Sequence, residues 1–140
     1  MKRITYLLML MLLLATFASC DKVYINGKLD GMWRLDNVQY PDSTVQPERV
    51  FYSFQRHLVQ VGKYYDEEFP VRFLGNLHYS GNTMSVSNFH SFPMELYPAT
   101  VEMLRDFHLY SDSTTFTIVT LNKDKLIMSN EDRIYSLTKW

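Results

Sequence analysis

Histidines are the first side chains to examine for acid–base or metal chemistry in this sequence. No two of the four have the spacing of a zinc pair, and no His-Glu-x-x-His motif is present. The chain also lacks a Gly-x-Ser-x-Gly nucleophile motif and a glycine-rich phosphate loop. We therefore predict no metal site and no catalytic residues, and we expect each histidine to be a surface or rim residue: His57, His78, His90 and His108.

An acidic run at residues 64–68 is the most distinctive polar segment. Its three consecutive carboxylates could bind a hard cation such as Ca²⁺, but the run lacks the alternating oxygen ligands and the glycine of a known calcium loop. We favour a solvated loop. The alternative is a contact surface for a partner, in which the aromatic rings of Tyr64 and Tyr65 dock.

Cys20 is the only cysteine in the chain, so no intrachain disulfide is possible. It follows a basic start and an apolar run from Ile4 to Ala15, which is the pattern of a secretory signal. That run is shorter than the ~20 apolar residues of a membrane-spanning helix. A lone cysteine at this place in an exported protein therefore needs a chemical reason.

Residues 17–20 supply that reason, because Ala18-Ser19-Cys20 resembles the end of a bacterial lipobox. The resemblance implies that the Cys20 thiol carries a diacylglyceryl group and that residues 1–19 are removed as a signal peptide. Phe17 departs from the leucine that is common there. The alternative is an ordinary signal peptide that ends near a cysteine.

Removal of the signal would leave 121 residues, enough for one domain with one core. Lys2 and Arg3 leave with it, so 12 basic residues remain against 15 acidic ones and the formal charge is −3. This mildly acidic balance argues against nucleic acid as a partner. Abundant tyrosine and phenylalanine favour β-structure.

The clearest local pattern is a hairpin at residues 71–88. Phe73, Gly75 and Leu77 lie on one face of the first strand, with Leu74 and polar residues on the other, and Met84 and Val86 lie inward on the next strand. A Ser-Gly-Asn turn joins the two strands, and a glycine on the inward face suits a bend in a barrel wall.

Similar patterns predict further strands at 31–40, 49–62, 114–121, 125–129 and 133–140. We expect irregular structure from Pro41 to Pro47 and from Phe89 to Pro98. Ala99 to His108 is the one segment with the periodicity of a helix. Seven or eight short strands joined by hairpins predict a sandwich or an up-and-down barrel.

Two segments sharpen this choice. The Gly31-Met32-Trp33 opening and the C-terminal stretch of residues 109–140 resemble the small lipocalin-like lipoproteins of Bacteroidetes-type bacteria. That resemblance implies an all-β fold, a small antiparallel up-and-down β-barrel with one short helix, in which Trp33 plugs the closed end. Residues 1–19 would be the signal peptide, 20–30 a lipidated tether and 31–140 the barrel. Another barrel or a sandwich remains the alternative.

Seven side chains are predicted to point into this barrel and are candidates for lining an apolar ligand cavity. An eight-stranded barrel is just wide enough either to fill itself or to hold one small ligand, so a filled core is the alternative. The candidates are Trp33, Tyr52, Phe54, Phe73, Tyr79, Met84 and Met128.

The leading hypothesis is therefore a membrane-anchored, non-enzymatic lipoprotein that binds a small apolar or amphipathic ligand at the open end of the barrel, opposite the tether. The alternative is an accessory subunit of an envelope complex with a filled barrel, and a third is an inhibitor of a hydrolase. No cofactor is expected apart from the covalent lipid on Cys20. Outer-membrane placement is usual for the group that the chain resembles, whereas Asp21 would favour the inner membrane under enterobacterial sorting. The leaflet is left open.

Overall fold

The computed structural model of the chain describes residues 1–16, 25–93 and 97–140, so the predicted lipidation site Cys20 lies outside the described residues. Helix α1 spans Lys2–Thr16, and the short 3-10 helix η2 spans Gly27–Leu29. Across the described part of the chain, no helix has both the length and the hydropathy needed to cross a membrane.

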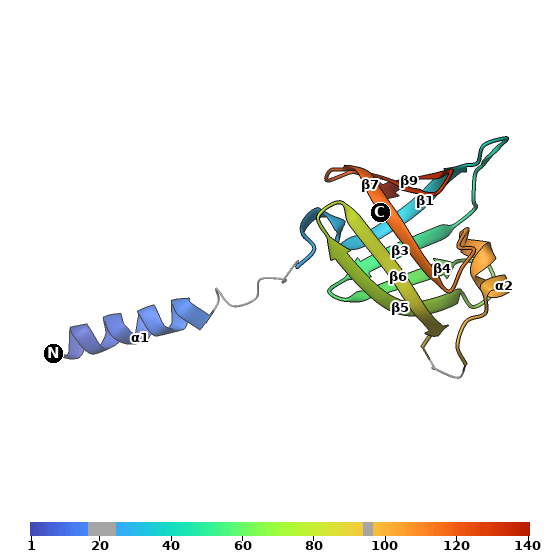
Figure 1. The fold of residues 1–140 in the computed structure, drawn as a ribbon. Coiled ribbons are helices and arrows are strands. Elements are labelled where there is room, and N and C mark those ends of the chain that lie inside the picture. Colours follow the sequence, from blue (N-terminus) through green and yellow to red (C-terminus); the bar gives the residue numbers. More distant parts are fainter. Residues whose placement is uncertain (17–24, 94–96) are drawn as a thin grey trace.

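Nine strands of the described chain form one antiparallel sheet. Strands β1 and β9 also pair, which closes β1 and β3 to β9 into an eight-stranded barrel, while the two-residue strand β2 lies beside β1 (Figure 1). This confirms the predicted up-and-down β-barrel. The strands are β1 (Gly31–Gln39), β2 (Thr44–Val45), β3 (Val50–Gln55), β4 (Leu58–Lys63), β5 (Val71–Ser80), β6 (Thr83–Ser91), β7 (Ser113–Leu121), β8 (Lys125–Asn130) and β9 (Arg133–Lys139).

The predicted short helix is also present, as α2 (Val101–Leu104) followed by the 3-10 helix η3 (Arg105–Phe107). The Thr100 side chain accepts a hydrogen bond from the Met103 backbone N–H, which caps the helix at its start. His108 then takes a left-handed backbone conformation, with φ of 60°, and ends η3.

The predicted hairpin of β5 and β6 is present, with Tyr79 opposite Met84, and it contains a bulge that the sequence marked only by a glycine. Pairing shifts between Leu74 opposite His90 and Asn76 opposite Ser87. A Cβ atom on Gly75 would lie 2.8 Å from both Phe89 Cδ1 and the Ser87 carbonyl oxygen. Only glycine therefore lets the two strands approach this closely.

Two predictions about loops are wrong. Strand β6 continues through Phe89 to Ser91, because the bulge lets it keep pairing with β5 where an irregular segment was expected. The expected loop before Pro47 contains β2, in which Thr44 and Val45 pair with the end of β1.

Every barrel strand contributes to one core cluster, together with η2, α2 and η3, and no described residue of α1 belongs to it. The barrel thus folds around a core of its own. The core begins at Leu29, which is fully buried, and Asp30 is only 5% exposed. The packed domain therefore starts a few residues before position 31.

The alternating strand directions divide the turns between two ends of the barrel. The tether end comprises residues 25–30, 56–58, 81–82, 122–125 and 139–140. The helix end comprises residues 40–49, 63–72, 97–112 and 131–133. In Figure 1 the blue segment that leads into β1 lies at the first end, and α2 lies at the second.

Candidate functional site

The seven side chains predicted to line a ligand cavity are packing partners of one another in the core. Six of them are no more than 3% exposed, and Tyr79 packs against the same cluster from a partly buried position. Ring contacts join Tyr52 to Phe54 at 6.4 Å and Phe73 to Phe107 at 5.8 Å between centroids. None of the seven lines any of the four surface pockets described below.

Trp33 closes the tether end, as the family resemblance implied. Its indole Nε1 donates a hydrogen bond of 2.8 Å to the Leu29 carbonyl oxygen, and the side chain is fully buried. The Lys139 ammonium lies 4.5 Å from the centroid of the Trp33 ring and donates to the Asp30 carbonyl oxygen. Burial lowers the pKa of Lys139, although the charge of Asp30 acts in the opposite direction.

Described residues also cover part of the opposite end, which was expected to be open. Helix α2 and η3 lie across it and bury Leu104 and Phe107, which are 1% and 0% exposed. These residues are three apart, so both point to the same side of the helical segment and into the barrel.

Two tyrosines from the barrel wall hold this helical segment in place. The Tyr52 hydroxyl donates to the Phe107 carbonyl oxygen, and the Tyr135 hydroxyl donates to that of His108 at 2.5 Å. Burial raises the pKa of Tyr52, and it raises the pKa of Tyr135 to about 12. Both hydroxyls therefore stay protonated and remain donors at neutral pH.

A second set of polar contacts connects Tyr40, His108 and Tyr110. The Tyr40 hydroxyl is 2.6 Å from His108 Nδ1 and 2.5 Å from the Tyr110 hydroxyl. Burial, and to a lesser extent Lys63, lowers the pKa of His108, while burial and Tyr110 raise the pKa of Tyr40. We assign a neutral imidazole that accepts from Tyr40, which in turn accepts from Tyr110. This arrangement supplies hydrogen bonds but no tyrosinate, so it holds the helical segment rather than activating a nucleophile.

His108 is partly buried at the helix end, so it also fits the expectation of a surface or rim residue. Of the other three, His57 and His78 are exposed, and His90 is partly exposed with Nδ1 3.0 Å from the Asn88 carbonyl oxygen. Across residues 1–16, 25–93 and 97–140, no group of three or more histidine, cysteine or acidic side chains is arranged to hold a metal ion.

Arg133 borders this network from β9. Its guanidinium lies 4.6 Å from the centroid of the Tyr110 ring, and it donates to the Asn130 side-chain oxygen at 2.6 Å. Its Nε is buried and has no acceptor among the described residues. A surface pocket of about 230 Å³ lies beside Arg133 and Tyr110, also bordered by Ser111, Ser113, Thr114, Asn130 and Glu131.

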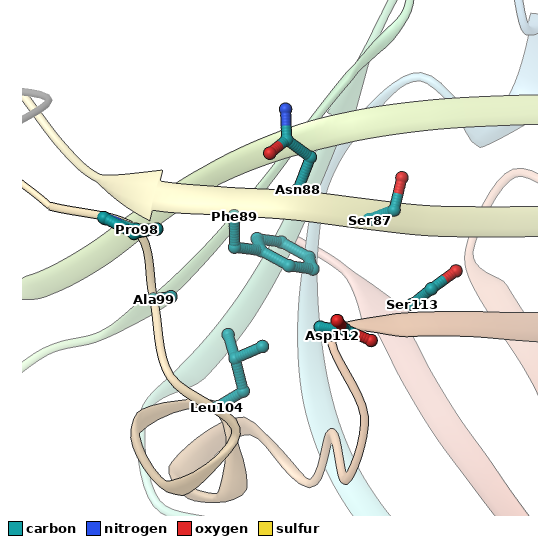
Figure 2. Close-up of a pocket in the computed structure, with 8 residues that line it drawn as sticks. All are labelled: Ser87, Asn88, Phe89, Pro98, Ala99, Leu104, Asp112 and Ser113. Atoms are coloured by element: carbon teal, nitrogen blue, oxygen red, sulfur yellow. The ribbon is translucent and has the colours of Figure 1, made fainter.

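A larger pocket, of about 340 Å³, lies where β6 and β7 diverge next to α2 (Figure 2). Pairing between these two strands stops at Ser87 opposite Ser113. Beyond that point, the Phe89 ring and the Leu104 side chain point toward one another across the gap, and Asp112 lies on the facing rim. The pocket thus has an apolar floor and a polar rim.

The predicted partner-contact residues lie in the exposed loop between β4 and β5. Tyr64 packs edge-on against Phe51, with ring centroids 5.3 Å apart, and Tyr65 is 40% exposed beneath the Lys63 ammonium. The side chain of Asp66 pairs with Arg49. Phe69, in the same loop, is 96% exposed.

This loop borders an aromatic surface on the outer barrel wall. Trp140 is 69% exposed and its ring lies 5.2 Å from that of Phe51, with the Arg34 guanidinium 5.7 Å above it. Together with Tyr64 and Met32, these rings line a groove of about 380 Å³. A second groove, of about 290 Å³, runs between Tyr65 and Glu48.

Three features of the helix end were not predicted from the sequence: the Tyr40–His108–Tyr110 network, the exposure of Phe69 and the helical segment that covers this end. The three network residues lie up to 70 positions apart in the chain, and no local spacing connects them. Phe69 stands directly after the acidic run, so an aromatic residue next to carboxylates was the one available signal.

Comparisons with known proteins agree with this architecture. The family model described as lipocalin-like domain matches residues 13–140. The chain is similar to the crystal structure of a lipocalin-like protein from Bacteroides uniformis, with 23% identity, a TM-score of 0.65, and coverage of 81% of this chain and 100% of that one. It is also similar to the structure of an uncharacterized protein from Bacteroides eggerthii, with 18% identity, a TM-score of 0.64, and coverage of 80% and 99%. No curated protein gives a significant match. The comparisons confirm the predicted lipocalin-like fold.

Proposed function

This chain belongs to the lipocalin-like domain family, and from that premise we propose that it is a membrane-anchored, non-enzymatic interaction module of the cell envelope. One barrel fold hosts many functions, so the family sets the scaffold and the surface must supply the role. The partner is a protein that meets the helix end of the barrel.

The observation that carries this proposal is the closure of the barrel at both ends. Trp33 and Leu29 close one end, and Leu104 and Phe107 close the other. The residues expected to line a ligand cavity belong to or pack against the buried core cluster, and the rings of Tyr52 and Phe54 are in contact. A barrel filled in this way is a rigid scaffold that presents its loops.

The anchor in this proposal is the lipid on Cys20, supported by the lipobox resemblance at residues 17–20. One acyl chain gives only marginal membrane binding, whereas two or three hold a protein stably. The proposal places the protein on the envelope after export, with the outer membrane as the expected site.

The proposed contact surface is the loop at residues 64–70. Phe69 and Tyr65 are exposed aromatic side chains of the type that dominates binding energy at interfaces. Asp66, Glu67 and Glu68 surround them with negative charge. A partner with a basic rim around an apolar pocket complements this loop, because opposite charges steer association and fix orientation.

Native mass spectrometry of the protein purified in mild detergent from its own envelope tests the proposal. We expect an acylated chain in a stoichiometric complex with one other protein, and we expect Phe69→Ala to release that protein. Val119→Ala is the matched control, since Val119 is 62% exposed on β7, away from the helix end. A lone monomer, or a complex that Phe69→Ala leaves intact, would contradict the proposal.

A small apolar ligand is the second candidate function, favoured by the pocket in Figure 2 and its floor of Phe89 and Leu104. The same spectra test it, because a bound small molecule adds a defined mass to the monomer. Ala99→Phe fills the pocket and is expected to remove that mass. Spectra of the native protein without any added small-molecule mass would exclude this candidate.

A further inference from the structure

The charges of the barrel are segregated between its two ends. The described residues of the tether end carry five basic and two acidic side chains, for a formal charge of +3: Lys28, Arg56, Lys123, Lys125 and Lys139 against Asp30 and Asp124. Those of the helix end carry five basic and ten acidic side chains, for −5: Arg49, Lys63, Arg72, Arg105 and Arg133 against Asp42, Glu48, Asp66, Glu67, Glu68, Glu102, Asp106, Asp112, Glu131 and Asp132.

The basic turns of the tether end form one continuous surface. Asn26 Nδ2 donates to the Arg56 carbonyl oxygen at 2.8 Å, which joins the first turn to the second. The Lys139 backbone N–H donates to the Asp124 carbonyl oxygen at 2.8 Å, and its ammonium donates to that of Asp30. These bonds connect three turns that are far apart in the sequence.

The cations on this surface are available to a partner. Lys28, Arg56, Lys123 and Lys125 are all exposed, and none forms a salt bridge with another described residue. Of the two acids, the Asp30 carboxylate is turned inward and accepts hydrogen bonds from Asn26. At the helix end, by contrast, Arg49 and Arg133 pair with neighbouring acids.

Exposed apolar side chains lie among these cations. Ile25 is 48% exposed and Leu58 is 45% exposed, whereas the Trp140 ring lies against Phe51 on the outer wall. Basic residues mixed with exposed aliphatic side chains suit the surface of an anionic bilayer, where the cations meet phosphates and the aliphatic groups reach the interface.

We propose that the tether end of the barrel docks on the anionic leaflet that carries the lipid anchor, and that the acidic helix end faces away from it. This rests on the anchoring part of the proposed function. The five peptide units between Cys20 and Ile25 span at most roughly 18 Å, so the tether end stays next to the leaflet. Attraction at one end and repulsion at the other then fix the orientation.

The test attaches the chain of residues 20–140 to vesicles through its single cysteine, with a maleimide-bearing phospholipid, so the outcome does not depend on acylation in the cell. One set of vesicles is phosphatidylcholine, and the other contains about 30% phosphatidylglycerol. Lipids brominated in the acyl chains quench nearby tryptophan. The reporter is Leu58→Trp in a Trp140→Phe chain, since Leu58 is 45% exposed in a tether-end turn, and the Trp140→Phe chain alone, with its buried Trp33, supplies the background.

We expect quenching of the Leu58→Trp reporter on the anionic vesicles, and its loss in about 0.5 M salt, where the screening length falls to roughly 4 Å. Partition of a Cys20→Ser chain onto the same vesicles is expected to fall about fivefold for Lys123→Gln and roughly 30-fold for Lys123→Gln/Lys125→Gln, since each basic residue near such a surface contributes about 1 kcal/mol. Arg105→Gln, which removes an exposed cation from the helix end, is the matched control and is expected to change little.

Equal quenching on neutral and anionic vesicles, no quenching on either, or an equal loss of partition with Arg105→Gln would overturn the docking proposal. Those outcomes leave the anchor itself untouched. A protein that carries no lipid when it is isolated from its own envelope, but docks when it is coupled chemically, would instead contradict the proposed function.

Discussion

The two ends of this barrel are closed by different means. At the tether end, closure is local in sequence, because Trp33 bonds to Leu29 only four residues before it. At the helix end, closure is long-range: Tyr52 and Tyr135 on the barrel wall bond to the backbone of Phe107 and His108. The tether end is closed by a residue of β1 itself, whereas the helix end is covered by a separate helical segment that two tyrosine hydroxyls hold in place.

The surfaces of the two ends differ just as clearly. One is basic with scattered apolar side chains, and the other is acidic with an exposed Phe69. Both ends belong to one barrel with one core, so the fold places a basic surface and an acidic surface at opposite ends of the barrel axis. The exposed side chains of the two ends can therefore change independently, because they lie outside the core cluster to which Leu29, Trp33, Leu104 and Phe107 belong.

Loss of the plug at the tether end is expected to have the largest effect on stability. Trp33→Ala removes a fully buried indole and leaves a cavity, so we expect the free energy of unfolding to fall by about 4 kcal/mol. Phe107→Ala at the helix end is expected to cost about 3 kcal/mol, since a short helical segment can settle into part of the space. Urea unfolding followed by circular dichroism measures both. A loss below about 1 kcal/mol for Trp33→Ala would contradict the expectation that the plug at the tether end contributes most to stability.

The wall between the two ends is expected to show the next largest effect. Gly75→Ala places a Cβ atom 2.8 Å from the Phe89 ring and from a backbone oxygen, which forces the bulge to shift. We expect a loss of about 2 kcal/mol in the same unfolding assay. Gly81→Ala is the control, because its Cβ would meet nothing within 4 Å and only the positive φ opposes it. An unchanged midpoint for Gly75→Ala would show that the bulge is not needed to reach Ser91.

The hydroxyl bonds at the helix end are expected to contribute less. Tyr52→Phe leaves the Phe107 carbonyl oxygen without its donor, and Tyr135→Phe does the same for His108. We expect each change to reduce stability by about 1 kcal/mol. Hydrogen exchange should locate the change, with faster exchange at residues 104–109 and unchanged exchange in η2. Uniformly faster exchange throughout the barrel would mean that the two ends are not separable.

The smallest effect is a pH dependence confined to the helix end. Burial lowers the pKa of His108 in the folded protein below its ordinary value of 6.5, so the unfolded chain takes up a proton first as the pH falls. Stability is therefore expected to be constant above about pH 7 and to decline from pH 6.5 downward. Thermal unfolding across this range measures the slope, and His108→Gln should flatten it. An identical slope in the variant would assign the effect to other groups.

Much of the fold follows from local sequence. The alternation through Phe73 and Leu77 predicted both the hairpin and its inward face, and the Gly-x-Trp opening predicted the plugged end. These features depend on neighbours in the chain, where side-chain period and turn chemistry decide the structure.

The site could not be predicted in the same way. Tyr40 and Tyr110 meet only because β1 and the end of η3 reach the same end of the barrel, and the extension of β6 depends on space that Gly75 leaves for Phe89. A sequence also cannot separate a filled barrel from a hollow one, because inward aromatic side chains serve both. The two-ended charge distribution becomes visible only after each turn is assigned to its end.

Hydrogen exchange of the acylated protein in two settings tests the division between the ends most directly. In anionic vesicles holding this protein alone, the account predicts slower exchange at residues 26–30, 56–58 and 122–125, and no change at 64–70. In native envelope membranes it predicts slower exchange at both sets. Slower exchange at residues 64–70 in the vesicles, or unchanged exchange of the tether-end turns in both settings, would contradict the account.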